Sequence, residues 1–192
     1  MKYFRLNFMF YFMNPTIFIL KFLLINGAIL FSINNSHGRG EFKKSSWEYQ
    51  CLPCGQDCDN ETYDKPGKCA HCQMQLVKKS TVTFKNISPT EICDYISKHP
   101  NTVLLDVRTK EEFDGKADPN FGTLKNSINI PVQELESRLS DISKLRKKEI
   151  IVFCSHSHRS PQASYILTQH GFHKVINMSG GMSVMTDKSC VK

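Results

Sequence analysis

Residues 152–161 of the chain read Val-Phe-Cys-Ser-His-Ser-His-Arg-Ser-Pro. The run that leads into Cys154, residues 149–153, is Glu-Ile-Ile-Val-Phe, and its continuous apolar character predicts a buried parallel strand. Ser160 and Pro161 suit the cap and the first position of a helix. Cys154 is therefore expected between a strand and a helix, at the edge of the sheet where α/β proteins bind ligands.

This position predicts a reactive thiol. Backbone N–H groups of a tight loop and the N-terminus of a helix both favour a thiolate over a thiol, so Cys154 is expected to be a nucleophile. Arg159 adds a fixed positive charge with a fork that suits a sulfur oxyanion. The other loop residues expected to contact the substrate are Ser155, His156, Ser157, His158 and Ser160.

The spacing of this loop limits its substrate. Four residues separate Cys154 from Arg159, whereas cysteine phosphatases of the same general shape use five. The shorter loop favours a smaller target, such as the outer sulfur of thiosulfate or of a persulfide. A cysteine phosphatase or an arsenate reductase is therefore disfavoured.

Further strands and helices alternate around this loop. Strands are predicted at residues 82–84, 102–106, 127–130 and 174–176; helices are predicted with Ser88 as cap, over residues 131–139, and from Ser160 to a C-cap at Gly171. This alternation predicts an α/β fold with a central parallel sheet and helices on both faces.

Four motifs of this region resemble, in order, those of the rhodanese family. They are Leu-Leu-Asp-Val-Arg-Thr-Lys-Glu-Glu-Phe at 104–113, Asn-Ser-Ile-Asn-Ile-Pro at 126–131, the loop at 154–160, and the segment from Gly171-Phe172 to Gly180-Gly181-Met182. The resemblance implies a sulfurtransferase in which Cys154 attacks thiosulfate, releases sulfite and passes the persulfide sulfur to a thiol or cyanide. Thr123 and Met185 stand where the family commonly has histidine and tryptophan.

Two alternatives remain for this domain. Cys154 can be a buried structural cysteine, or the domain can be a non-catalytic binding module of a metal-sensing or metal-handling protein. Asp106 and Arg108 end a strand at the same edge as Cys154 and are candidate substrate contacts, although Arg108 can instead pair with Glu112 one helical turn on.

A second group of cysteines lies earlier in the chain. Cys51-Leu-Pro-Cys54 and Cys69-Ala-His-Cys72 are two C-x-x-C pairs, a spacing that predicts one tetrahedral metal site with these four thiolates as ligands. Structural zinc is the first choice and copper(I) the second, with no organic cofactor. Two disulfides or a dithiol redox pair are the alternatives. Cys93 and Cys190 have no partner motif and are treated as incidental.

This region resembles the small heavy-metal-binding domain found beside bacterial copper-handling proteins. The resemblance is carried by Tyr-Gln-Cys at 49–51 and by residues 64–77. Cys54 stands where that family usually has histidine, and Gln73 where it has glycine. Spare ligand candidates are Cys58, His71 and Met74.

Composition and the N-terminus suggest the remaining organisation. The formal charge is +7, but the basic residues are spread along the chain, which argues against nucleic acid, while the charge favours small anionic substrates. The rhodanese resemblance implies that the partners are a small sulfur-containing anion and a thiol acceptor. Residues 1–36 are predicted to be a signal peptide or a membrane anchor that contacts the membrane or the export machinery, and a buried core helix is the least favoured alternative. After this leader come a linker (37–46), the cysteine-rich unit (47–79) and the rhodanese-like domain (80–192). The leader indicates an exported protein, either periplasmic or anchored in the inner membrane and facing the periplasm.

Overall fold

The structure is a computed structural model that describes residues 48–192. These residues belong to one compact unit, Lys43–Lys192. The predicted leader at 1–36 and the linker at 37–46 lie outside the described residues. Within residues 48–192, every helix is too short or too polar to cross a membrane.

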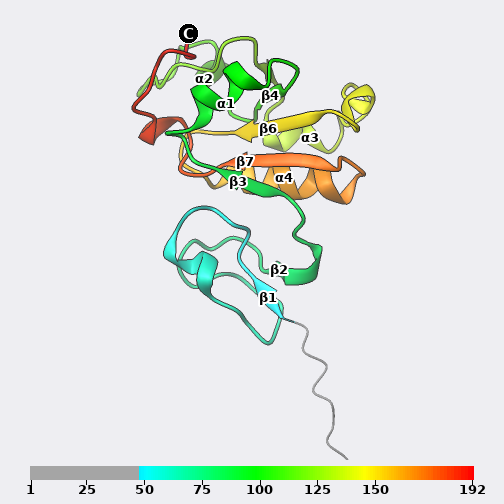
Figure 1. Ribbon diagram of the computed structural model, residues 1–192. Helices are drawn as coiled ribbons and strands as arrows, with labels where there is room; N and C mark the ends of the chain where they lie inside the picture. Colours follow the sequence, from blue (N-terminus) through cyan, green and yellow to red (C-terminus); the bar gives the residue numbers. More distant parts are fainter. Residues whose placement is uncertain (1–47) are drawn as a thin grey trace, which may run out of the picture. The chain divides into compact units, whose positions relative to one another are not determined.

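A five-stranded sheet forms the centre of the part of the chain that follows the cysteine-rich unit, called here the sheet domain (Figure 1). Its strands are β3 (Lys85–Ile87), β4 (Val103–Asp106), β5 (Ile128–Asn129), β6 (Glu149–Phe153) and β7 (Lys174–Met178). Their order is β3-β7-β6-β4-β5, and every neighbouring pair is parallel. The α/β fold with a parallel sheet is thus confirmed, and β6 occupies its middle.

Helices cover both faces of this sheet, as Figure 1 shows. They are α1 (Ile92–Lys98), α2 (Lys110–Phe113), α3 (Val132–Leu135) and α4 (Arg159–Gln169). Two apolar clusters fill the layers: Leu135 of α3 and Leu167 of α4 pack on one face with Val152, and Ile92 of α1 packs on the other with Phe153. Successive residues of β6 therefore enter opposite layers, as expected for a strand buried on both sides.

Several boundaries differ from the sequence prediction. The first strand is Lys85–Ile87 and not residues 82–84, although Phe84 is buried in the core. The first helix begins at Ile92, because Ser88 and the next residues form a turn in which the Glu91 N–H donates to the Ser88 carbonyl (3.0 Å). The helix expected over 131–139 is regular only at Val132–Leu135, and a 3₁₀ turn η3 (Ser143–Leu145) follows later.

The cysteine-rich unit has little regular structure. An antiparallel pair, β1 (Tyr49–Gln50) and β2 (Val77–Lys78), brackets it, and the 3₁₀ turns η1 (Asp57–Asn60) and η2 (Lys79–Thr81) complete it. Its buried cluster consists of Cys51, Cys54, Cys58, Cys69 and Leu76. Thiols thus occupy the place that aliphatic side chains fill in the sheet domain.

A disulfide joins Cys93 of α1 to Cys190 near the C-terminus. The expectation that these two residues are incidental is therefore wrong. The sequence does not reveal the pair, because 97 positions separate the two cysteines and no local motif marks them. The last residues then pair with the 122–125 segment, where the N–H groups of Thr123 and Lys192 donate to each other's carbonyls at 3.0 and 2.8 Å. The disulfide therefore fastens the C-terminal residues to the sheet domain.

Candidate active site and metal centre

Cys154 directly follows β6, at the carboxyl end of the central strand. Its side chain is only 1% exposed, and its Sγ accepts a hydrogen bond from the Ser160 N–H and donates one to the Ser160 hydroxyl oxygen, each at 3.4 Å. Helix α4 begins at Arg159, two residues before the predicted first position Pro161, so Ser160 lies in its first turn. The thiol is thus aimed at the positive end of a helix, which favours a thiolate.

The loop between Cys154 and α4 alternates its side chains. Ser155 and Ser157 point inward and are buried, whereas His156 and His158 are exposed. Ser157 adopts a φ of 64° in the left-handed region, and its buried Oγ has no partner among the described residues. Within residues 48–192, the backbone N–H groups of 155–158 also find no acceptor. Donors are therefore available around Cys154 for an anion.

A second backbone segment presses against this loop. The carbonyl of Cys154 accepts from the Met182 N–H (2.8 Å), and that of Ser155 accepts from the Ser183 N–H (3.0 Å), where the 3₁₀ turn η4 (Met182–Val184) begins. Gly181 has a φ of 71°, and a β-carbon there would lie 2.4 Å from the Ser155 carbonyl oxygen. Only glycine permits this approach, in which the carbonyls of Cys154 and Ser155 are taken up by hydrogen bonds to the facing backbone.

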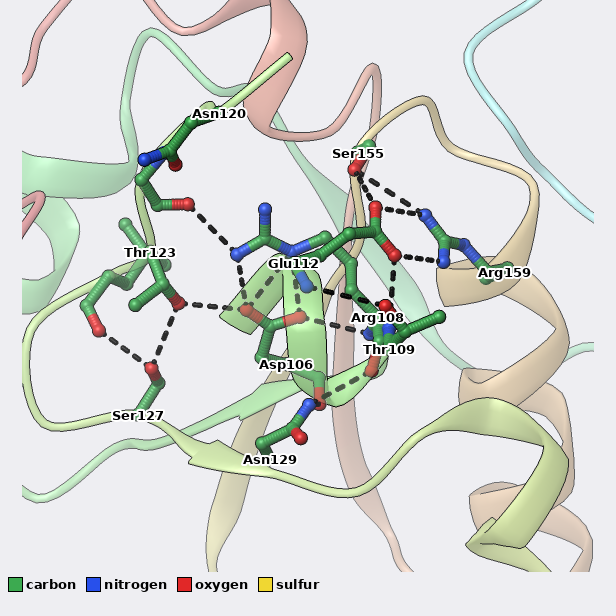
Figure 2. A network of polar contacts seen from close by, with 12 residues as sticks. Asp106, Arg108, Thr109, Glu112, Asn120, Thr123, Ser127, Asn129, Ser155 and Arg159 are labelled. Atoms are coloured by element: carbon green, nitrogen blue, oxygen red, sulfur yellow. Dashed lines mark hydrogen bonds and ion pairs between the residues drawn. The ribbon is translucent and has the colours of Figure 1, made fainter. Parts of the chain in front are cut away.

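Arg159 does not point freely into the loop (Figure 2). Its guanidinium makes two bonds to the carboxylate of Glu112, at 2.6 and 2.8 Å, and Glu112 also accepts from the Ser155 hydroxyl at 2.7 Å. Glu112 belongs to α2 and closes a capping box with Thr109. The alternative pairing of Arg108 with Glu112 is therefore wrong: Arg159 is the partner, 47 positions away in sequence.

The surroundings of Glu112 keep it ionised. The Arg159 guanidinium lowers the pKa of this carboxyl to about 2, against the opposing effect of burial and with help from Ser155 and Thr109. The carboxylate in turn raises the pKa of Arg159. The Glu112–Arg159 ion pair therefore links α2 to the start of α4.

Asp106 and Arg108 form a separate network, also drawn in Figure 2. Both are buried, and Arg108 donates to Asp106 through Nε (2.9 Å) and a terminal nitrogen (2.6 Å) and to the Gly122 carbonyl (2.9 Å). The Thr123 hydroxyl donates to Asp106 at 2.8 Å. The polar groups of Asp106 and Arg108 thus bond to each other, to the Gly122 carbonyl and to Thr123, which gives this pair a structural role.

Four thiols of the cysteine-rich unit converge. The sulfur atoms of Cys51, Cys58, Cys69 and Cys72, called here the cysteine cluster, all lie within 4.8 Å of one another, and Cys51 and Cys72 are 3.0 Å apart. Thiolates on one tetrahedral ion, with metal–sulfur bonds of about 2.3 Å, are separated by roughly 3.8 Å. The chemistry and spacing of this donor set fit a soft metal ion.

Cys54 occupies a different position from the one expected. Its Sγ is 3.9 Å from that of Cys58 and 3.3 Å from Asp59, and Asp59 accepts from the backbone N–H groups of Cys54 and Gly55. The structure therefore brings Cys51, Cys69 and Cys72 together as predicted but places Cys58, one of the spare candidates, as the fourth thiol of the cluster. The bonds from the Cys54 and Gly55 N–H groups to Asp59 hold Cys54 in a tight turn, and Cys58 takes its place in the cluster.

The thiols of the cluster differ in acidity. Burial raises the pKa of Cys51 and of Cys58. Burial also opposes ionisation of Cys69, but backbone N–H groups of Cys72 and His71 lower its pKa to about 6. Cys69 therefore offers a thiolate at neutral pH around which a metal site can assemble.

Two segments of the described chain match known families. Residues 88–188 match the model of the rhodanese-like domain, and residues 49–79 match that of the heavy metal binding domain. A protein of Schizosaccharomyces pombe, provisionally named a mitochondrial thiosulfate sulfurtransferase, is 33% identical over 57% of this chain and 84% of its own. A sulfurtransferase of Allochromatium vinosum is 29% identical over 43% of this chain and 69% of its own.

Solved structures are similar as well. A rhodanese-like domain protein from Staphylococcus aureus is 23% identical, with a TM-score of 0.47, over 57% of this chain and 99% of its own.

Proposed function

Because the chain belongs to the family of rhodanese-like domains, we propose that it transfers sulfane sulfur and that Cys154 carries this sulfur as a persulfide. The observation behind the proposal is the setting of the Cys154 Sγ, which lies at the carboxyl end of β6 beside the first turn of α4. The N–H groups of 155–158 have no acceptor among the described residues. Such a cradle stabilises first a thiolate and then a persulfide anion.

The proposed reaction has two displacement steps. The Cys154 thiolate attacks the outer sulfur of thiosulfate, the S–S bond of thiosulfate breaks, and sulfite leaves with the bonding electron pair. A thiolate or cyanide then attacks the outer sulfur of the persulfide, and Cys154 departs as the thiolate with which it began. A persulfide donor enters the first step in the same way and leaves as a thiol.

Arg159 acts as a positioning residue in this proposal. Its charge is matched by Glu112, so it is less available for a substrate oxyanion than the sequence suggested. The two bonds instead hold the loop between α2 and α4, with Ser155 attached to the same carboxylate. The groups left for the substrate are the loop amides, the buried Ser157 hydroxyl and the exposed imidazoles of His156 and His158.

An intact mass of the full chain after thiosulfate treatment tests this function. We expect the mass of one added sulfur atom, removal of that sulfur by cyanide, and no addition in Cys154→Ser. Serine can still bond to Ser160, so the variant should keep its thermal midpoint. A folded, reduced wild type that gains no sulfur would instead support the non-catalytic binding module.

We further propose that Cys51, Cys58, Cys69 and Cys72 hold zinc, with copper(I) as the alternative ion. The ion would crosslink three short segments of a unit whose buried cluster is largely thiol. Elemental analysis of the purified chain should give one metal per chain, and Cys58→Ser should lower that content several-fold. Cys54→Ser is the matched control and should retain the metal; the reverse result would restore Cys54 as the ligand.

Export is proposed as the context in which the protein works. The apolar leader at 1–36 suggests it, and the Cys93–Cys190 disulfide supports it, since such bonds persist in oxidising compartments. Alkylation of intact cells with a membrane-impermeant thiol reagent should label the protein. Labelling that requires cell lysis would contradict export.

A further inference from the structure

A cavity of about 360 Å³ lies between the cysteine cluster and the loop of Cys154. On one side it is lined by Gln56, Cys58, His71 and Cys72, and on the other by His156, His158, Gly180, Ser183 and Val184. The cavity therefore joins two thiols of the cysteine cluster, Cys58 and Cys72, to the loop that begins at Cys154, whose His156 and His158 line the facing wall. All of these residues lie in the single compact unit Lys43–Lys192.

Specific contacts hold the two sides of the cavity together. Leu52 is buried in the apolar core of the sheet domain, and the neighbouring Pro53 carbonyl accepts a hydrogen bond from Asn177 of β7 at 3.2 Å. Gly55 has a φ of 81°, and a β-carbon there would lie 3.2 Å from that of Ser179. The segment after Ser179 holds the carbonyls of Cys154 and Ser155, so one stretch of backbone supports the cysteine turn and the active loop alike.

Cys72 is the thiol of the cluster best placed to react across this space. It lines the cavity and is partly exposed, whereas Cys51, Cys58 and Cys69 are buried. Short backbone bonds restrain its turn, from the Gln73 N–H to the Cys69 carbonyl and from the Cys69 N–H to the Met74 carbonyl. Cys51 lies immediately behind it, with 3.0 Å between the two sulfur atoms.

We propose that Cys72, when no metal occupies the cluster, accepts the sulfane sulfur from Cys154, and that Cys51 then releases it as hydrogen sulfide. The proposal rests on the sulfur-carrying role of Cys154 and names its acceptor within the same chain. The outer sulfur of a persulfide extends about 2 Å beyond the Cys154 Sγ. The cavity lined by Cys72 on one wall and by His156 and His158 on the other is the space through which this sulfur would reach the Cys72 thiol.

This transfer from Cys154 to Cys72 and on to sulfide is called here the relay. Its atoms and electrons balance in one turnover without another reagent. The Cys72 thiolate attacks the outer sulfur, Cys154 leaves as a thiolate, and a Cys72 persulfide forms. The Cys51 thiolate attacks the Cys72 Sγ and expels hydrosulfide, which leaves a Cys51–Cys72 disulfide. The sulfane sulfur is reduced by two electrons and the two thiols are oxidised; an external dithiol resets the pair for the next turnover.

Metal and sulfur therefore compete for the same two thiols. A metal bound to Cys51 and Cys72 occupies the acceptor and the resolving group together, and sulfur then remains on Cys154. Loss of the metal turns the cluster from a metal site into a dithiol reductant.

The test is a single turnover of the full chain, with its metal removed and one equivalent of thiosulfate added without oxygen. Sulfite, sulfide and the position of the sulfur in alkylated peptides are measured together. We expect equal sulfite and sulfide from the wild type, together with the Cys51–Cys72 disulfide. Cys51→Ser should trap sulfur on Cys72, Cys72→Ser should leave it on Cys154, and sulfide should fall at least tenfold in each.

The zinc-loaded wild type serves as the matched control, because its sequence is unchanged. It should release sulfite at the wild-type level and keep the sulfur on Cys154. Sulfite release also shows that the sheet domain of each variant is folded. When the metal is chelated from protein that already carries sulfur on Cys154, tenfold dilution should not change the rate constant of sulfide formation, since transfer occurs within one molecule.

The possible failures are distinguishable. Sulfite release with a stable Cys154 persulfide in the metal-free wild type would overturn the relay and leave the sulfurtransferase function intact. A rate constant of sulfide formation that rises in proportion to protein concentration would have the same meaning. Absence of both sulfite and sulfur addition would overturn the proposed function itself.

Discussion

The loop of Cys154 and the cysteine cluster both present thiols from short backbone turns, but their supports differ. Cys154 ends the central strand of a five-stranded sheet whose two faces carry separate apolar clusters. The cluster of Cys51, Cys58, Cys69 and Cys72 lies in a unit with one pair of two-residue strands, and its buried residues are mostly the thiols themselves.

This difference separates two ways of fixing a reactive group. Burial of aliphatic side chains fixes the sheet domain, so its loop geometry exists before any ligand binds. The cysteine-rich unit has too little apolar surface for that, and a metal can supply the missing crosslink. The turn of Cys51–Gly55 is the exception, since Leu52 inserts into the core of the sheet domain.

Metal removal should give the largest effect and expose this contrast directly. Chelation is expected to raise amide-exchange rates of residues 56–76 at least tenfold, because only short turns then restrain them. Residues of β4, β6 and β7 should keep their protection. Hydrogen-exchange mass spectrometry of the full chain checks this, and a uniform loss over the whole chain would show that the two regions fold as one.

The Cys93–Cys190 disulfide should be the strongest crosslink of the sheet domain. Cys93→Ser with Cys190→Ser is expected to cost about 2–5 kcal/mol and to lower the thermal midpoint by roughly 5–15 °C, because the bond closes a loop of 97 residues. Metal content should not change. A midpoint within 1–2 °C of the wild type, an effect of roughly 0.5 kcal/mol or less, would show that the C-terminal pairing holds without the bond.

Glu112→Gln should have a smaller effect that depends on pH. The folded-state pKa of Glu112 is about 2, below its usual 4.5, so its stabilisation is present above pH 4.5 and is lost as the pH falls toward 2. That contribution is roughly 2–3 kcal/mol near neutral pH. Denaturant titrations between pH 2 and 7 should show it in the wild type and not in the variant.

Glu134→Gln is the matched control for this prediction. Glu134 pairs with Arg138 at 3.0 Å, but both side chains are more than 40% exposed, and such pairs contribute little. We expect a change within about 0.5 kcal/mol. If Glu112→Gln and Glu134→Gln changed the free energy of unfolding equally, the Glu112–Arg159 pair would not support the loop.

Gln73→Gly should produce the smallest change, and in the opposite direction. Gln73 has a φ of 60°, which explains why glycine is usual at this turn of the cysteine-rich unit. Relief of this conformation is expected to stabilise the unit by up to about 1 kcal/mol. Gln73→Ala keeps a β-carbon and should give no gain, and metal affinity measured by competition with a chelator compares the two.

Much of the fold could be predicted from local sequence. The β6 strand, residues 149–153, has the predicted bounds, since one apolar run between polar residues specifies it. The start of α1 was wrong by three residues, because Ser88 and Glu91 bond within a turn that resembles a helix cap. Local patterns thus specify that an element exists better than where it begins.

The sequence by itself determined the parallel sheet, the position of Cys154 between strand and helix, and the presence of a thiol-rich metal unit. Apolar periodicity, a helix start and C-x-x-C spacing are local signals that survive without knowledge of the partners. Only the tertiary structure decided that Arg159 binds Glu112, that Cys58 replaces Cys54, and that Cys93 bonds to Cys190. These partners depend on how distant segments approach one another, and that approach is set by the packing of the whole core.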